Sequence, residues 1–121
     1  MSQEPSSPAR YPRRGEVWYA YLDPVVGREQ AGRRPVLVIT EDVFNAGPSE
    51  LVVVLPITSR LREIPSHVVI QGGVSGLDRP CAIMCEAVRS ISRQRLNKPI
   101  GRVPTETLAL VTRVMRVLLG L

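Results

Sequence analysis

The sequence has very few of the side chains that bind metals or take up protons near neutral pH. Its 121 residues include one histidine, His67, and two cysteines, Cys81 and Cys85. These residues do not have the spacing of a zinc site, and the acidic residues are scattered rather than paired. A metal-dependent nuclease and a two-histidine nuclease are therefore both disfavoured. The chain also lacks a phosphate-binding loop and a dinucleotide fingerprint, so we expect neither a metal nor a cofactor.

Long hydrophobic runs are missing as well. The longest are PVLVI and LVVVLPI, which fall far short of the ~20 residues of a membrane-spanning helix, and no stretch resembles a secretory signal. Cys81 and Cys85 belong to one predicted strand, where a rise of ~3.3 Å per residue separates their Cα atoms by about 13 Å, too far for a disulfide. The sequence therefore predicts reduced thiols, no membrane partner and a cytoplasmic protein.

What the chain does have is positive charge, almost all of it from arginine. The 16 lysine and arginine residues exceed the 11 acidic residues and give a net charge of +5, and Lys98 is the only lysine. A basic surface favours polyanionic partners. The planar guanidinium group can bind a phosphate with two hydrogen bonds, although genome-wide base composition produces the same bias without functional meaning.

Composition divides the chain into a tail and one domain. Residues 1–14 carry Pro5, Pro8 and Pro12 among serines and charges, which is typical of a flexible tail. Residues 15–121 are enough for one compact domain with a core and too few for two. The hydrophobic fraction of 44% supports such a core.

Hydrophobic patterning predicts a mainly β domain with one clear helix. Residues 105–119 place Leu108, Val111 and Met115 on one face at helical spacing, and residues 41–47 favour a helical turn or two. The predicted class is α+β, a small barrel-like antiparallel sheet with an amphipathic C-terminal helix packed against it. The five predicted strands cover residues 16–23, 35–40, 50–59, 67–72 and 81–92.

Arginines and hydroxyls gather at the ends of two predicted strands. Arg33 and Arg34 precede the second strand, and Thr58 lies at the end of the third. In an antiparallel sheet the start of one strand lies beside the end of its neighbour, so the two clusters would face one pocket suited to a phosphate. The alternative is that Arg34 is a surface arginine and Thr58 an ordinary strand residue, and residue types alone favour this alternative.

Several motifs follow one another in an order that indicates a family. They are RRGEVWYAYLDPVVGREQAGRRPVLVITEDVFN, VVVLPITSR, IPSHVVI and EAVRSIS. With this order and spacing, the chain from Arg14 to the C-terminus resembles the MazF/PemK (Kid) family of toxin endoribonucleases. The resemblance implies an SH3-like barrel of CcdB/PemK-like architecture that forms homodimers. It also implies metal-independent cleavage of single-stranded RNA and silencing by an antitoxin.

The resemblance also implies roles for individual residues. Arg34 matches the family's catalytic arginine and Thr58 its catalytic threonine, while Glu29 and Gln30 match a pair that gates the site and holds RNA. Ala87 departs from the family, which often has glutamine there, so the cut sequence cannot be inferred from relatives. The predicted RNA-binding residues are Arg28, Glu29, Gln30, Arg33, Ser59, Arg60, Arg62 and Arg89.

The predicted reaction is attack of the RNA 2′-hydroxyl on the adjacent phosphorus. Arg34 would stabilise the negative phosphorane, since a guanidinium with a pKa above ~12 is a poor base. Thr58 would donate a hydrogen bond to a non-bridging oxygen. For His67, the only ordinary side chain that titrates near neutral pH, a structural role is favoured over a catalytic one.

Two other functions remain open on the same barrel. One is a CcdB-like gyrase poison without nuclease activity, which would need neither Arg34 nor Thr58. The other is a non-catalytic RNA-binding module, which would bind RNA in a salt-sensitive way and leave it whole.

The C-terminal helix predicts partners. Its apolar face, from Leu108 to Leu119, exceeds what a lone small barrel needs on one side. We therefore expect a homodimer, and the resemblance implies that the RNA groove runs near its interface. The second expected partner is an acidic, partly disordered antitoxin segment.

Overall fold

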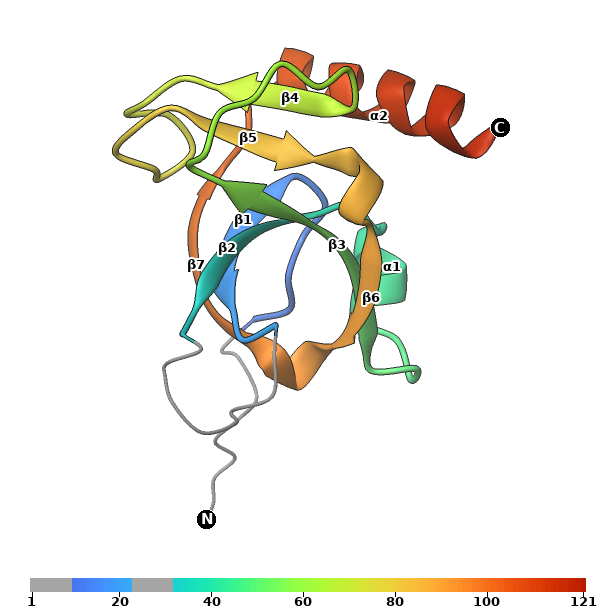
Figure 1. The fold of residues 1–121 in the computed structure, drawn as a ribbon. Helices are drawn as coiled ribbons and strands as arrows, with labels where there is room; N and C mark the ends of the chain where they lie inside the picture. The colour runs from blue at the N-terminus through green and yellow to red at the C-terminus, as the bar shows by residue number, and fades with distance from the viewer. Residues whose placement is uncertain (1–9, 23–31) are drawn as a thin grey trace.

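The computed structural model describes residues 10–22 and 32–121 (Figure 1). This part of the chain forms one curved antiparallel sheet, a short helix and a longer C-terminal helix. Two 3₁₀ turns, Cys85–Ala87 and Arg93–Arg95, interrupt the strands. In chain order the elements are β1 (Glu16–Ala20), β2 (Arg34–Val38), α1 (Asp42–Asn45), β3 (Leu51–Thr58), β4 (His67–Ile70), β5 (Cys81–Met84), β6 (Arg89–Ser92), β7 (Leu96–Arg102) and α2 (Thr105–Leu119).

Strand β3 is shared by two parts of the sheet. On one side it pairs with β2, which is followed by β1 and β7. On the other side its first half pairs with β6, while Ile57 and Thr58 pair with β5, the neighbour of β4. Strands β7, β1, β2, β3 and β6 curve round a ring (Figure 1), although no strand pairing joins β6 to β7 within the described residues. The predicted class is confirmed, and the barrel is left open at that edge.

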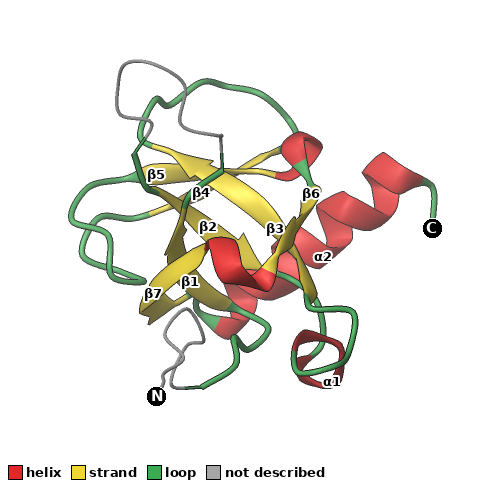
Figure 2. Cartoon of the chain, turned by 90° about the horizontal axis from the view of Figure 1, so that it is seen from below, coloured by secondary structure: helices red, strands yellow, loops and turns green. Residues whose placement is uncertain are grey.

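Both faces of the central strands are buried, because one lines the ring and the other is covered by α2. In β1, Val17 belongs to the cluster that contains Val111 and Met115 of α2, whereas Trp18 belongs to the cluster inside the ring. Figure 2 shows α2 on the far side of the strands when the molecule is seen from below. Burying a side chain such as Met115 stabilises the fold by roughly 1.5–3 kcal/mol. No helix in the described part of the chain has the length and apolarity to cross a membrane.

Two parts of the sheet differ from the prediction. The predicted strand 81–92 is two strands, β5 and β6, because the 3₁₀ turn Cys85–Ala87 lets them pair with different stretches of β3. Strand β7 was missed because its sequence LNKPIGR is polar and contains Pro99 and Gly101. A proline is tolerated there since, among the strands that the structure describes, β7 pairs with β1 alone, at an edge, with two register shifts.

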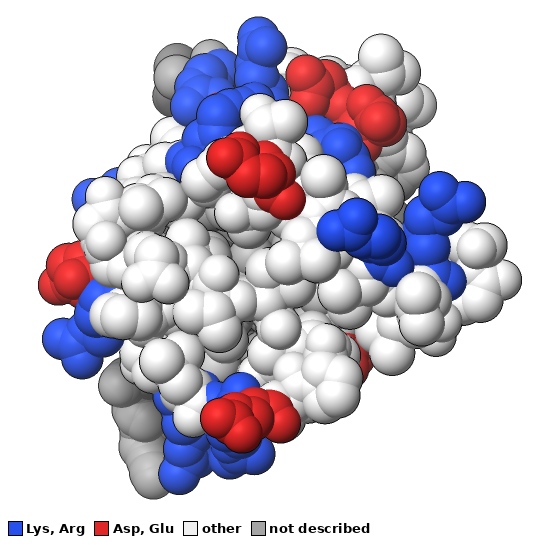
Figure 3. All heavy atoms as spheres, turned by 90° about the horizontal axis from the view of Figure 1, so that it is seen from above, with Lys and Arg blue, Asp and Glu red and all other residues white. Residues whose placement is uncertain are grey.

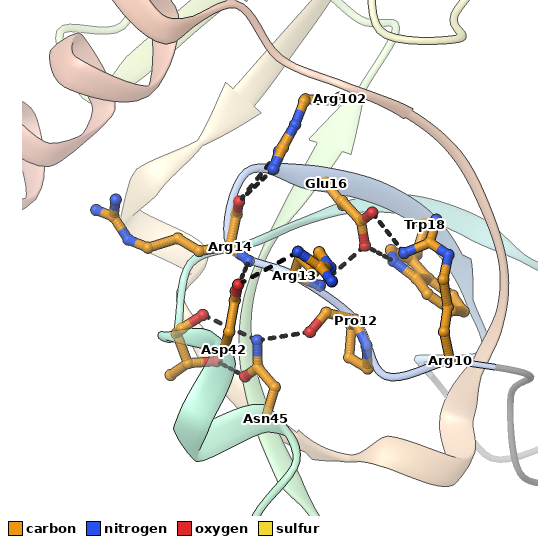
Figure 4. A network of polar contacts seen from close by, with 10 residues as sticks. Arg10, Pro12, Arg13, Arg14, Glu16, Trp18, Asp42, Asn45 and Arg102 are labelled. Carbon is orange, nitrogen blue, oxygen red and sulfur yellow. Dashed lines mark hydrogen bonds and ion pairs between the residues drawn. The ribbon is translucent and has the colours of Figure 1, made fainter.

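The residues just before β1 are bound to the sheet (Figure 4). The Glu16 carboxylate accepts hydrogen bonds from the Arg10 guanidinium at 2.6 Å, the Arg13 backbone N–H at 2.8 Å and the Trp18 Nε1 at 3.0 Å. Pro12 is fully buried, and its carbonyl accepts a hydrogen bond from Asn45 Nδ2 at 3.0 Å. Contacts with the domain thus begin five residues before Gly15, where we expected the folded part to start. The predicted tail residues 1–9 lie outside the described residues.

These contacts also set the ionisation of the buried glutamate. Burial is the largest single influence and raises the pKa of Glu16. The hydrogen bonds from Trp18, the Arg13 amide and Arg10, together with the positive charge of Arg10, outweigh burial and lower the pKa below its usual 4.5. The charged form of Glu16 is therefore the form that stabilises the start of β1.

Candidate active site

The two predicted arginine and hydroxyl clusters lie together because of the register between β2 and β3. Val36 pairs with Pro56 and Val38 with Val54, and extending this register outward by two residues sets Arg34 opposite Thr58. Both line a surface hollow of about 240 Å³, which we call the hollow. Its lining residues are Arg33, Arg34, Pro35, Ile57, Thr58, Ser59, Leu77, Asp78, Arg79 and Cys81.

The Thr58 hydroxyl is oriented by its own backbone. Thr58 Oγ1 accepts a hydrogen bond from the backbone N–H of Arg60 at 3.0 Å, a local side-chain to backbone contact typical of threonine at a strand end. Since the oxygen acts here as an acceptor, its own hydrogen remains available for donation. The arrangement suits a donor to an anionic oxygen in the hollow.

The two neighbouring arginines have different environments. The Arg33 guanidinium lies 4.4 Å from the centre of the Tyr19 ring and donates a hydrogen bond to Asn97 Oδ1 at 2.9 Å, so it is held against β1 and β7. Arg34 is exposed, and its guanidinium takes part in none of the hydrogen bonds between described residues. Arg34 therefore places a positive charge at the edge of the hollow.

The other predicted RNA-binding residues differ in whether they line the hollow. Ser59 lines the hollow, whereas Arg60 and Arg62 are exposed on the segment after β3 and are not among the described residues that line it. Arg89, at the start of β6, donates to the Leu22 carbonyl at 3.2 Å and so connects β6 to the residues that follow β1. Arg28, Glu29 and Gln30 lie outside the described residues.

Residue-based reasoning missed one wall of the hollow. The connection between β4 and β5 brings Leu77, Asp78 and Arg79 beside Arg34 and Thr58. The sequence of this loop, including DRPCAI, carries no pattern that shows what the loop contacts. The hollow therefore has a β2–β3 wall and a loop wall.

Cys81 and Cys85 are both buried and form no disulfide. Burial raises the pKa of Cys81, an effect that Arg79 opposes and Asp78 adds to. Burial raises the pKa of Cys85 to about 11, with a smaller contribution from Glu86. Cys81 thus presents a protonated thiol to the hollow.

His67 lies at the start of β4 and contacts Glu86 rather than the hollow. Its Nε2 is 2.9 Å from Glu86 Oε2, and Ser66 Oγ donates to Glu86 Oε1 at 2.6 Å. Burial is the largest influence and raises the pKa of Glu86, but the hydrogen bonds from Ser66, the Glu86 backbone amide and His67, with the charge of His67, together lower it. This pairing agrees with a structural role for His67. Within the described residues there is no cluster of three or more metal-binding side chains.

A second concave surface lies between α2 and the residues just before β4, and it differs in chemistry. We call it the apolar groove; its volume is about 270 Å³. Seen from above, uncharged atoms fill the middle of this face and charged side chains lie toward its margins (Figure 3). The groove is lined by Pro65, Ser66, Leu110, Arg113, Val114, Val117 and Leu118.

The chain is thus a small antiparallel β protein with a C-terminal helix and a hollow lined by arginine and threonine. The chain belongs to the family of PemK-like, MazF-like toxins of type II toxin–antitoxin systems, whose characteristic sequence matches residues 13–119.

Individual relatives support this membership. Endoribonuclease MazF9 of Mycobacterium tuberculosis is 36% identical over 114 residues, covering 90% of this chain and 97% of that protein. Endoribonuclease EndoA of Bacillus subtilis is 36% identical over 110 residues, covering 90% and 95%. Among solved structures, a MazF from Deinococcus radiodurans superimposes with a TM-score of 0.76 at 29% identity, covering 92% of this chain and 98% of that one. A MazE–MazF structure from the same organism gives 0.79 at 28% identity, covering 92% and 97%.

Proposed function

We propose that the chain is the toxin of a toxin–antitoxin pair and an endoribonuclease that cuts single-stranded RNA in the hollow without a metal. The observation that carries this proposal is the meeting of Arg34 and Thr58 in one hollow. Two relatives that are 36% identical over nearly their whole length are themselves named endoribonucleases. The net charge of +5 adds a general attraction for RNA.

The reaction we propose uses the RNA's own 2′-hydroxyl as the nucleophile. The 2′-oxygen forms a bond to the adjacent phosphorus and loses its proton, the bond from phosphorus to the 5′-oxygen breaks, and the departing oxygen takes up a proton. Arg34 remains charged and stabilises the phosphorane between these steps. Thr58 donates a hydrogen bond to a non-bridging oxygen, which typically contributes ~3 kcal/mol to the stability of the transition state.

RNA on either side of the scissile phosphate would contact the other predicted residues. Ser59 lines the hollow, and Arg60 and Arg62 follow it on the exposed segment after β3. Arg28, Glu29, Gln30, Arg33 and Arg89 complete the proposed binding set. Phosphate contacts by several such arginines would make the affinity depend steeply on salt.

We propose two protein partners in addition to RNA. A second copy of the chain would cover the apolar groove, since Val117 and Leu118 of α2 are 81% and 44% exposed. An acidic antitoxin segment would complement the positive charge. This proposal is supported by solved structures of MazE–MazF from Deinococcus radiodurans, to which this chain is similar. Cellular RNA as the target implies that the toxin acts in the cytoplasm.

The decisive test is cleavage of a long RNA in excess EDTA, with the 5′ ends of all fragments mapped. We expect discrete cuts by the wild-type protein and none by Arg34→Ala. A matched control is Arg116→Ala. Arg116 and Ile39 line a separate concavity. Ile39 follows the last residue of β2, whereas Arg34 is its first, so this concavity lies at the other end of the strand. Intact RNA with a folded wild-type protein would favour a gyrase poison or a binding module instead.

A further inference from the structure

The loop that forms the second wall of the hollow is docked on β7 through main-chain contacts. Residues 71–80 run from β4 to β5 and pass β7 so closely that two glycines are required. A Cβ added to Gly76 would lie 1.9 Å from the Ile100 carbonyl oxygen, and one added to Gly101 would lie 2.3 Å from the backbone of Ser75. Gly76 also has a φ of +82°, which L-residues with side chains rarely adopt. The loop therefore has little freedom to move relative to β7.

The same loop fixes the backbone of Arg79. A Cβ on Gly72 would be 3.0 Å from the Arg79 Cα, so Gly72 packs directly against it. The Cys81 thiol donates to the Arg79 carbonyl at 3.4 Å, and the buried Leu77 side chain anchors the loop in the core cluster beneath α2. The main chain of Arg79 is thus held from two sides, close to the point where β5 begins.

The side chain of Arg79, in contrast, contributes little to the fold. It is 68% exposed, and its ion pair joins Nε to the Asp78 carboxylate at 3.6 Å, with that carboxylate 91% exposed. Exposed pairs of this kind stabilise a protein by only about 0–1 kcal/mol. Because Asp78 faces Nε, the pair leaves the two terminal nitrogens of the guanidinium to contact a phosphate.

The position of Arg79 complements that of Arg34. Arg34 extends from the β2–β3 wall and Arg79 from the loop wall, and both line the same hollow as Thr58. Arg33, the third arginine there, is held against β1 and β7 by its contacts with Tyr19 and Asn97. A nucleic-acid backbone that crosses the hollow with one phosphate at Arg34 and Thr58 would pass Arg79 on the opposite side.

We propose that Arg79 binds a backbone phosphate adjacent to the scissile one, and that the contact of its loop with β7 positions it to do so. This inference rests on the proposed function, because it assumes that RNA occupies the hollow. Arg79 is a binding residue in this scheme, and Gly101 acts through the loop as a positioning residue.

The first test measures binding of a labelled single-stranded 2′-deoxy oligonucleotide of mixed sequence, which lacks the attacking hydroxyl. Fluorescence anisotropy at several salt concentrations gives the slope of log K against log salt. Loss of one phosphate contact flattens this slope by about 0.7 for a single strand. We expect this change for Arg79→Ala and the wild-type slope for both Arg79→Lys, which keeps the charge, and Arg116→Ala.

The second test measures cleavage at a mapped site in a defined RNA. A contact to a neighbouring phosphate is made equally in the ground state and the transition state, so Arg79→Ala should raise KM about tenfold with kcat nearly unchanged. Gly101→Ala should also raise KM although Arg79 is still present, and adding Arg79→Ala to it should change KM little further. If Gly101→Ala lowers the Tm too far for the assay, Gly72→Ala replaces it, since this substitution should displace the same loop backbone by less.

The outcomes separate the inference from the proposed function. If the wild-type protein cuts RNA and Arg79→Ala matches it in salt slope and KM, Arg79 contacts no phosphate and the inference fails alone. If Arg79→Ala behaves as expected but Gly101→Ala and Gly72→Ala fold and leave KM unchanged, the positioning role of the loop contact fails. A wild-type protein that neither binds the oligonucleotide nor cuts RNA removes both proposals together.

Discussion

The hollow and the apolar groove are concavities of similar size with opposite chemistry. The hollow measures about 240 Å³ and presents Arg34, Arg79 and Thr58, whereas the groove measures about 270 Å³ and is mainly aliphatic. Attraction of a polyanion to the hollow weakens as the salt concentration rises. Burial of the apolar groove depends on its apolar area and is insensitive to salt at low concentration. Volume therefore does not distinguish the two concavities, whereas the exposed atoms that line them do.

The largest effect is expected when the hollow's chemistry is changed and its shape is kept. Thr58→Val removes the hydroxyl with little change in volume, and loss of one preorganised donor should lower kcat by about a hundredfold. Thr58→Ser keeps the donor and should retain most of the activity. The measurement is single-site cleavage kinetics in EDTA. Equal kcat for Thr58→Val and wild type would show that the threonine is not a transition-state contact.

A second prediction concerns the scaffold that carries both surfaces. Asn45 is fully buried, and its Nδ2 donates to the Pro12 carbonyl at 3.0 Å and the Thr40 carbonyl at 2.9 Å. Asn45→Ala leaves these carbonyls without their partner, so the free energy of unfolding should fall by about 2 kcal/mol. Urea denaturation measures this change, with the exposed Gln94→Ala as the control. At low temperature kcat and the oligomeric state should stay the same, because neither surface is altered.

The third prediction sharpens the role of the groove. Val117 is 81% exposed, so Val117→Asp should cost the monomer at most about 0.5 kcal/mol. In a dimer that buries this face, the charge should raise the dissociation constant by about tenfold or more. Val43→Asp, on α1 and 87% exposed, is the matched control. Light scattering over a concentration series checks both variants, and a wild-type protein that stays monomeric would contradict the homodimer.

The smallest predicted effect lies away from both surfaces, at Glu16. Its pKa is lowered in the folded state from the usual 4.5, so its contribution to stability is full above that value and is lost as the pH falls through the folded value. Glu16→Gln should remove this dependence. Urea titrations above and below pH 4.5 should therefore show a larger loss of stability in the wild type than in the variant. Parallel losses would mean that the Glu16 contacts do not favour the charged form.

Much of the fold followed from local patterns. Buried β-branched runs predicted β2 and β3, and helical spacing predicted α2 with its first and last residues at Thr105 and Leu119. The 3₁₀ turn after β5 was not predictable, because Cys85 continues the apolar alternation and only pairing with two stretches of β3 breaks the strand. Strand β7 was hidden by Pro99, which is acceptable only because that strand forms an edge.

For the site, residue types and strand ends were enough to bring Arg34 and Thr58 into one hypothesis, since antiparallel neighbours place such ends together. The basic charge, the scarcity of metal-binding residues and the apolar face of α2 can also be recognised from the sequence without the structure. The place of Arg79 beside Arg34 and Thr58, in contrast, depends on how the chain packs in three dimensions. The loop that carries Arg79 is held beside β7 because Gly76 and Gly101 let the two backbones approach closely. The residues in contact, such as Gly76 and Ile100, are far apart in the sequence. Contacts between main chains carry no side-chain pattern, so no periodicity in the sequence records them.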